Sequence, residues 1–322
     1  MSGKNFASNQ DVRWCPGCGN YVVLATIQKL LAEMGILKEN VAFISGIGCS
    51  SRFVYYMDTY GFHTIHGRAT AVAAGLKIMR PDLSVWIVTG DGDGLSIGLG
   101  HLLHLMRRNI DVNILLLNNQ IYGLTKGQYS PTSQLGVISN SSPFGSIDKP
   151  FNPIKLAMAA ECSFVARAMD SDPKHLANVI KQATLHTGTS FIEVLQNCGV
   201  YNNDAFSIYR EQQFRQDSCV YLQMGQPVRF GKQLEKGIQL INQRPVIKHD
   251  VSDANMHELL IHNATSIDHS SAILADMQTP EFPLALGIFK AIKRQSYHEV
   301  IANRVKSVKT KHNRTFIDVL NS

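Results

Sequence analysis

Short apolar runs recur along the first two-thirds of the chain and alternate with longer segments whose apolar residues are spaced as on a helix. The runs are rich in β-branched residues and are bounded by glycine or polar residues, which is typical of buried strands. Four of them are nearly continuous in apolar side chains, as expected of strands that are covered on both faces. The runs are 41–45, 84–89, 112–117, 163–167 and 190–195.

The segments between these runs predict helices at 21–34, 69–79, 94–107, 153–161 and 173–187. Strands that alternate with helices of this length are joined by crossover connections, so the sequence predicts an α/β fold with a parallel sheet and helices on both faces. The segment between the third and fourth strands, 123–153, is rich in Gly, Ser, Thr and Pro and predicts a long loop.

The chain becomes more polar after Cys198, with helical patterns only at 231–241 and 256–264 and no clear continuation of the sheet. We therefore expect two units. Residues 1–200 would form the core, and residues 201–322 would form a C-terminal extension that packs on the core or on a partner.

Composition adds limits on location and partners. The chain has 322 residues, of which 44% are hydrophobic, and can bury a sizeable core. No apolar stretch resembles a signal peptide or reaches membrane-spanning length, so we expect a cytoplasmic protein without membrane contact. The formal net charge is +6, with much of the excess in 290–314. That stretch lacks aromatic interleaving and any recognisable nucleic-acid module, so we interpret it as a solvated basic tail.

Six cysteines in such a chain argue for metal or redox chemistry, because the cytoplasm keeps thiols reduced. Cys15 and Cys18 form a C-x-x-C pair that can share one metal centre. Cys49 follows the first apolar run and Cys198 follows the last, so both fall at carboxyl ends of strands. Ligands spread this widely favour an iron–sulfur cluster, although zinc stays open. Two further cysteines are expected to be buried and free, Cys162 and Cys219.

Polar residues also follow two consecutive predicted strands. Asp91 stands in TGDGDGL after the run at 84–89, and Asn119 stands in LNNQIYG after the run at 112–117. The carboxyl ends of parallel strands share one edge, where ligands bind in open α/β sheets. Carboxylate, amide and carbonyl oxygens suit Mg²⁺, and the glycines allow backbone N–H groups to approach an anion. We interpret these motifs as a magnesium and diphosphate site; the alternative is two turns that only end strands.

The motifs WCPGCG, GIGCSS, HTIHGRATAVAAGLK, GDGDGLSIG and LNNQIYGLTKGQYSPTS stand in this order. Together they resemble the β subunit of 2-oxoacid:ferredoxin oxidoreductases over about Val12 to Cys198, with weaker similarity at 224–231 and 247–250. The resemblance implies a thiamine-diphosphate-binding fold with three cofactors: thiamine diphosphate, Mg²⁺ and a [4Fe–4S] cluster.

The resemblance also assigns residues. The implied Mg²⁺ ligands are Asp91, Asn119 and the carbonyl of Ile121, and the implied cluster ligands are Cys15, Cys18, Cys49 and Cys198. Contacts with thiamine diphosphate are implied for Ile47, Gly48, Ser50, His66, Gly92, Asp93, Gly123 and Leu124.

In this family a 2-oxoacid is oxidatively decarboxylated to an acyl-CoA, and the electrons pass through the cluster to ferredoxin. The thiamine needs a general base, which the family supplies from its α subunit. We therefore expect this chain to be inactive alone and to work as an αβ heterodimer or a dimer of such pairs. Its motifs look closer to the 2-oxoglutarate branch than to the pyruvate branch. Lys126 could pair with a distal carboxylate or be an ordinary exposed lysine.

Two other functions stay open. A non-oxidative thiamine-diphosphate decarboxylase or carboligase would share Asp91 and Asn119 but would need no cysteine cluster. A zinc-stapled binding subunit without catalysis would use the cysteines only as a structural site. His101 and His104 have ligand spacing on a predicted helix but lack a third ligand, and we interpret them as structural.

Overall fold

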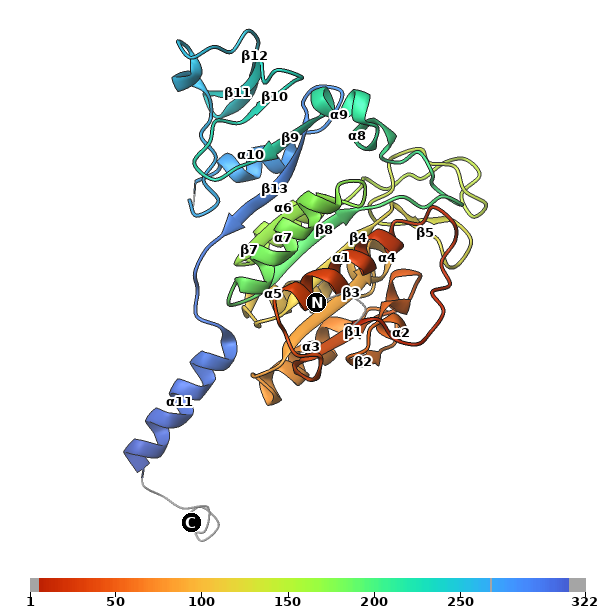
Figure 1. Ribbon diagram of the computed structural model, residues 1–322, viewed down its shortest axis with the longest axis vertical. Helices are drawn as coiled ribbons and strands as arrows, with labels where there is room; N and C mark the ends of the chain where they lie inside the picture. Colours follow the sequence, from red (N-terminus) through yellow and green to blue (C-terminus); the bar gives the residue numbers. More distant parts are fainter. Residues whose placement is uncertain (1–5, 267, 313–322) are drawn as a thin grey trace.

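The main feature of the computed structural model, which describes residues 6–266 and 268–312, is an eight-stranded sheet. The strand order is β2-β1-β3-β4-β8-β7-β13-β9, and every neighbouring pair is parallel except β7 with β13. Figure 1 shows this sheet running through the body of the molecule. Its strands are β1 (Val41–Ser45), β2 (Tyr60–His63), β3 (Ser84–Gly90), β4 (Asn113–Asn118), β7 (Phe164–Met169), β8 (Ser190–Leu195), β9 (Cys219–Leu222) and β13 (Leu284–Ala291).

The central strands are covered on both faces, which explains their continuous apolar sequences. In β4, Leu115 and Leu117 pack into one hydrophobic cluster, whereas Ile114 and Leu116 pack into another on the opposite face. Helices α1 and α7 contribute to the first cluster, and α3, α5 and α6 contribute to the second. The predicted fold class is therefore confirmed.

Most of the predicted helices form close to the expected bounds. They are α1 (Asn20–Glu33), α3 (Ala69–Met79), α5 (Leu99–Arg107), α6 (Pro153–Ala159) and α7 (Pro173–Leu185). Two of them begin with a polar cap followed by proline: the side chain of Asn152 accepts a hydrogen bond from Lys155 N, and that of Asp172 accepts one from His175 N. Such caps satisfy backbone N–H groups that have no partner within the helix.

The helix expected at 94–107 is wrong in its bounds, because the helical segment begins at Asp91 and is broken. A short helix α4 (Asp91–Leu95) ends at Ser96, whose φ and ψ of −97° and −108° are not helical, and α5 starts at Leu99. At the break the chain passes close to another loop. A Cβ on Gly98 would lie 2.7 Å from the carbonyl oxygen of Asp93 and 3.1 Å from the Cα of Gly67.

The region after Cys198 departs most from expectation, because two of its strands, β9 and β13, continue the main sheet. The helix expected at 231–241 is also wrong. Residues 236–241 form β11, which pairs in an antiparallel hairpin with β12 (Arg244–Lys248). The turn between them places Asn242 and Gln243 at φ values of 50° and 62°, as a tight two-residue hairpin requires. Of the helix expected at 256–264, only a 3-10 turn forms, at Met256–Glu258.

The remaining elements are short, apart from the C-terminal helix. They are α2 (Phe53–Tyr56), β5 (Ile121–Tyr122), β6 (Gln128–Tyr129), α8 (Ser207–Arg210), α9 (Gln212–Ser218), β10 (Arg229–Phe230), α10 (Ser270–Asp276), α11 (Tyr297–His312) and two 3-10 turns, Lys38–Asn40 and Ser50–Arg52. Helix α11 extends outward from the body and contains most of the expected basic tail (Figure 1). The end of that tail, 313–314, lies outside the described residues. Among the described residues, no helix is long and apolar enough to cross a membrane.

An ion pair lies inside the sheet, between Arg167 on β7 and Glu193 on β8, which face each other in the strand register. The Nε atom of Arg167 is 2.7 Å from Oε2 of Glu193, and the side chains are 6% and 2% exposed. Asn118 Nδ2 donates to the other carboxylate oxygen at 2.8 Å. Removing one partner would leave a charge buried without compensation.

We expect Arg167→Met to lower the free energy of unfolding by about 3–5 kcal/mol, because Glu193 would remain charged and buried. The double variant Arg167→Met/Glu193→Gln should regain most of this loss, since the neutral amide can still accept from Asn118. Urea denaturation measures both. The exposed pair Arg80–Asp82 is the control; Arg80→Met should leave the denaturation midpoint unchanged. Equal destabilisation by the single and double variants would contradict this account.

Candidate active site

One pocket lies at the carboxyl ends of β1, β3 and β4, on the edge that the sequence predicts. It is lined by every residue to which the sequence assigned Mg²⁺ or thiamine contacts: Ile47, Gly48, Ser50, His66, Asp91, Gly92, Asp93, Asn119, Ile121, Gly123 and Leu124. Of the four predicted cluster ligands, Cys49 also lines it. The parallel register thus brings together residues from distant parts of the chain.

Asp91 is buried at the start of α4, and its carboxylate is held by two hydroxyl groups. Ser130 Oγ and Thr132 Oγ1 donate to the same oxygen, Oδ2, at 2.5 and 2.6 Å. Burial raises the pKa of Asp91 above its ordinary value, and the two hydroxyls oppose that rise. A bound cation would favour the ionised carboxylate, so the site suits a metal ion.

Asn119 lies on the turn after β4, where its side chain and backbone are both fixed. Its Oδ1 accepts from the backbone N–H of Ile121 at 3.2 Å, and its carbonyl accepts from Asn202 Nδ2 at 2.9 Å. The second of these contacts joins the turn to the segment after Cys198.

Tyr122 packs against the turn that contains Gly92. Its hydroxyl donates to the carbonyl of Gly92 at 2.8 Å, and a Cβ on Gly92 would lie 2.3 Å from its ring. Glycine is therefore required at position 92 by the close approach of this ring.

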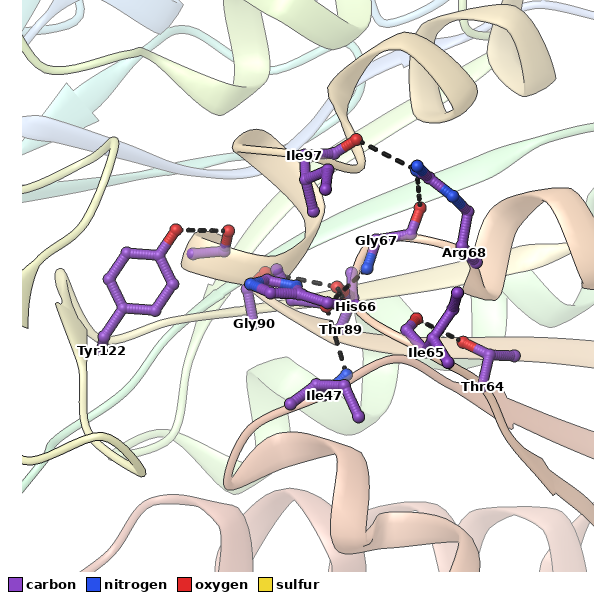
Figure 2. A network of polar contacts seen from close by, with 12 residues as sticks. Ile47, Thr64, Ile65, His66, Gly67, Arg68, Thr89, Gly90, Ile97 and Tyr122 are labelled. Carbon is purple, nitrogen blue, oxygen red and sulfur yellow. Dashed lines mark hydrogen bonds and ion pairs between the residues drawn. The ribbon is translucent and has the colours of Figure 1, made fainter.

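Asp93 organises the loops around the pocket, because its carboxylate is already bound inside the protein. Oδ1 accepts from the backbone N–H groups of Ile47 and Gly67 at 3.1 and 2.8 Å, and Oδ2 accepts from Thr89 Oγ1 at 2.7 Å. The Nδ1 atom of His66 lies 2.5 Å from Oδ1. Figure 2 shows Ile47, His66 and Thr89 gathered in one place, the first two from loops and the third from strand β3. Asp93 lines the pocket, but its carboxylate is occupied by hydrogen bonds to the segments that surround the pocket.

The cysteines approach the same edge. A Cβ on Gly123 would lie 3.7 Å from the sulfur of Cys49 and 3.6 Å from that of Cys198, so both sulfurs adjoin the turn that also carries Ile121. The backbone N–H of Cys18 donates to the carbonyl of Cys15 at 3.1 Å, which closes the C-x-x-C turn.

The C-x-x-C turn is fixed against the segment after β8. The N–H of Gly19 donates to the carbonyl of Asn197 at 3.2 Å, and a Cβ on Gly19 would lie 2.2 Å from the Asp170 carboxylate. The indole of Trp14 donates to the carbonyl of Cys49 at 2.7 Å. These contacts bring all three cysteine-bearing segments together.

The electrostatics of the thiols confirm that they are neighbours. Burial, together with the neighbouring thiols of Cys49, Cys198 and Cys15, raises the pKa of Cys18 to about 12, against an opposing hydrogen bond from the backbone of Asn20. The pKa of Cys49 is raised by burial and by Cys198 and Cys15. Binding a metal centre here must therefore displace protons from the thiols. Within residues 6–266 and 268–312, no three His, Cys, Asp or Glu side chains form a preformed site for one metal ion.

The two cysteines expected to be structural are confirmed as buried. Cys162 is 0% exposed and Cys219 is 3% exposed.

Sequence reasoning missed several residues of the site. Tyr122, Thr125 and Gln196 line the pocket. Ser130 and Thr132 donate hydrogen bonds to the Asp91 carboxylate. Ser130 and Thr132 stand in the GQYSPTS stretch, whose density of hydroxyls is the one local signal. Gln196 is 1% exposed, and within the described part of the chain its Oε1 has no hydrogen-bond partner. An unpaired buried polar atom that lines a pocket fits a bound polar group.

We expect Gly46→Ala to disrupt the pocket, because a Cβ at this position would overlap with the Asp93 carboxylate. That carboxylate holds Ile47, His66 and Gly67. The free energy of unfolding should fall by roughly 1–3 kcal/mol. Thermal denaturation measures this. The control is Gly75→Ala in helix α3, where a Cβ meets nothing within 4 Å; it should be neutral or stabilising by up to about 1 kcal/mol. Equal stability of the two variants would contradict the role assigned to Asp93.

Comparison with known proteins identifies the family. A family model described as the C-terminal TPP-binding domain of thiamine pyrophosphate enzymes matches residues 46–194. The chain is 48% identical over 314 residues to the 2-oxoglutarate oxidoreductase subunit KorB of Mycobacterium tuberculosis, which covers 95% of this chain and 82% of that protein. It is 45% identical over 192 residues to the 2-oxoacid:ferredoxin oxidoreductase subunit beta of Saccharolobus solfataricus, which covers 59% and 63%.

A solved structure agrees over almost the whole chain. It is the 2-oxoglutarate:ferredoxin oxidoreductase from Magnetococcus marinus, with 2-oxoglutarate, coenzyme A and succinyl-CoA bound. The two share 31% sequence identity with a TM-score of 0.76, and the match covers 98% of this chain and 92% of the other. The resemblance inferred from the sequence motifs is confirmed: the chain belongs to the family of 2-oxoacid:ferredoxin oxidoreductase β subunits.

Proposed function

We propose that this chain is the cofactor-binding β subunit of a 2-oxoglutarate:ferredoxin oxidoreductase. The reaction would convert 2-oxoglutarate and coenzyme A into succinyl-CoA and CO₂, with two electrons passed to ferredoxin. The observation that carries the proposal is that oxygen ligands and thiols adjoin one pocket at the carboxyl edge of the sheet. The 2-oxoglutarate specificity of the Mycobacterium and Magnetococcus relatives supports the choice of substrate.

Asp91, Asn119 and the carbonyl of Ile121 would hold Mg²⁺, and the ion would bind the diphosphate. The buried carboxylate of Asp91, held by hydroxyls on one oxygen, supports this assignment. Gly92 and Gly123 keep the space beside the ion free of side chains. Further contacts with the cofactor would come from Ile47, Gly48, Ser50, His66, Asp93 and Leu124, all of which line the pocket.

The four cysteines would bind a [4Fe–4S] cluster. The hydrogen bond from Gly19 to Asn197, which joins the C-x-x-C turn to the segment of Cys198, supports this assignment. The position of Cys49 and Cys198 beside Gly123 also supports it. Only the turn of Gly123 would then separate the cluster from the diphosphate. When bound, thiamine diphosphate supplies the electron sink that loss of CO₂ requires, and the cluster supplies a one-electron acceptor.

The chain's own residues would position the reactants and exclude water. Asp93 orients the His66 ring through Nδ1, so that the other ring nitrogen can face the pocket. The His66 side chain is 43% exposed and could reach a bound substrate. Lys126 is exposed beyond the pocket lining, where it could meet a distal carboxylate of the substrate.

The site would be completed by an α subunit. The enclosed part of the pocket measures about 100 Å³, less than the roughly 300–1,000 Å³ of complete small-molecule sites. Among the described residues that line it there is no glutamate, and the family assigns the general base to the α subunit. Residues 1–200 would hold the cofactors, residues 201–322 would form the extension, and the complex would act in the cytoplasm.

We expect the chain to reduce methyl viologen with 2-oxoglutarate and coenzyme A only when its α subunit is present. Anaerobic assays of the isolated chain and of the complex measure this. In the complex, kcat/KM for 2-oxoglutarate should exceed kcat/KM for pyruvate. Reduction of viologen by the isolated chain would refute the shared site. A complex that decarboxylates 2-oxoacids without reducing viologen would instead be a non-oxidative enzyme.

We expect serine at any of Cys15, Cys18, Cys49 or Cys198 to lower the iron and sulfide content of the anaerobically purified complex severalfold. The controls are Cys162→Ala and Cys219→Ala, which remove buried thiols remote from the pocket and should retain both elements. Metal and sulfide analysis checks this. One zinc per wild-type chain without iron would overturn the cluster and favour a structural metal site.

A further inference from the structure

Part of the long polar loop is buried and packed behind the candidate magnesium site. Whereas most residues of 134–149 are exposed or half-buried, Ser130, Thr132 and Ser133 are only 2–3% exposed. Ser133 Oγ accepts from the N–H of Ser130 at 2.8 Å and donates to the carbonyl of Gln120 at 2.5 Å. The loop thereby delivers two hydroxyls to Asp91.

The Thr132 hydroxyl differs from that of Ser130 in what lies on its other side. Both contact Oδ2 of Asp91, but Thr132 Oγ1 also lies 2.9 Å from Oδ1 of Asn118. A hydroxyl has one hydrogen, and its contact with Asp91, at 2.6 Å, is the shorter. The side-chain oxygen Oδ1 of Asn118 also accepts from the N–H of Gln120 at 3.1 Å, so it stays satisfied when Thr132 donates to Asp91.

The orientation of the Asn118 side-chain amide is fixed by the hydrogen bonds of its nitrogen and its oxygen. Its Nδ2 donates to Oε1 of Glu193 at 2.8 Å, and the other carboxylate oxygen accepts from Arg167 Nε at 2.7 Å. A carboxylate paired with arginine only accepts, so the amide nitrogen must face Glu193 and the oxygen must face Thr132. Asn118, Thr132, Glu193 and Arg167 are all at most 5% exposed. The fixed Oδ1 of Asn118 is thus a buried neighbour of the Thr132 hydroxyl, and the one hydrogen of that hydroxyl goes to Asp91.

We propose that Thr132 is a positioning residue for the metal ligand: held by the Ser133 contacts that fasten its loop to Gln120, its hydroxyl donates to Oδ2 and fixes the Asp91 carboxylate so that Oδ1 is presented to Mg²⁺. Both hydroxyls bind Oδ2, and neither binds Oδ1. The inference rests on the proposed magnesium and thiamine diphosphate site. It assigns a role to the SPTS segment, which the proposed function leaves without one.

The test compares Thr132→Val, which keeps the shape but removes the hydroxyl, with Thr132→Ser, which keeps the hydroxyl. In the αβ complex we expect Thr132→Val to raise the Mg²⁺ concentration for half-maximal binding of thiamine diphosphate by about 10–100-fold, the usual effect of losing such a partner of a metal ligand. In Thr132→Ser this Mg²⁺ concentration should stay within about threefold of the wild-type value, because the serine hydroxyl can still donate to Asp91. Titration of the apo complex with Mg²⁺ at fixed thiamine diphosphate, followed by tryptophan fluorescence or calorimetry, measures both.

A second readout separates positioning from general damage. At saturating Mg²⁺, Thr132→Val should recover most of the wild-type kcat and retain its iron content. The matched control is Thr184→Val, which removes a hydroxyl that donates to Ile180 O on helix α7 and should leave the Mg²⁺ titration unchanged. If Thr132→Val does not fold, Thr132→Ala replaces it without β-branched bulk.

The outcomes are distinct. An unchanged Mg²⁺ requirement in Thr132→Val would overturn the inference while leaving the proposed function intact. An equal loss in Thr132→Val and Thr132→Ser would also overturn it, because loop shape rather than the hydroxyl would then matter. Binding of thiamine diphosphate by the wild-type complex without any need for a divalent ion would overturn the magnesium site itself, and the inference with it.

Discussion

The parallel pairing of β1, β3, β4 and β8 is the constraint on which the site depends. Because these strands run in the same direction and in register, their carboxyl ends meet at one edge. Residues separated by more than half of the chain thus share one small region. The strands remain in register because both faces are buried under helices, and a slip by one residue would move apolar side chains from one hydrophobic cluster to the other. Packing of the core therefore fixes the spacing of the polar groups at its edge.

Asp91 and Asp93 stand in one motif but differ in their hydrogen-bond partners, and these partners indicate different roles. Asp93 accepts from two backbone N–H groups and the Thr89 hydroxyl and contacts His66, so it is committed to holding the loops. Asp91 is equally buried and binds two hydroxyls through one oxygen. A buried carboxylate with few partners is costly, whereas a cation beside it would compensate that cost. The arrangement is consistent with one acid that serves the fold and another that serves the cofactor.

The polar interior continues beyond the pocket. Asn118, Glu193 and Arg167 place hydrogen-bonding groups in strands that are otherwise apolar. Buried polar groups are tolerated when each is satisfied, and such networks also fix the orientation of every member. The Asn118 amide cannot rotate without facing Glu193 with its oxygen. Rigidity behind the pocket limits movement of the metal ligands in front, which is what precise positioning of a cofactor needs.

The sequence alone determined the positions of β1, β3, β4, β7 and β8, the fold class and the residue types at the ends of these strands, because these depend on local patterns of apolar residues and on the topology of parallel sheets. It failed at the hairpin at 236–248, whose turn requires positive φ at Asn242 and Gln243; asparagine favours such a φ, but glutamine does not. Only the tertiary structure decided that Asp93 binds the loops and that Ser130 and Thr132 bind Asp91. Those hydrogen bonds join residues far apart in the chain, and their partners are fixed by packing rather than by any local pattern.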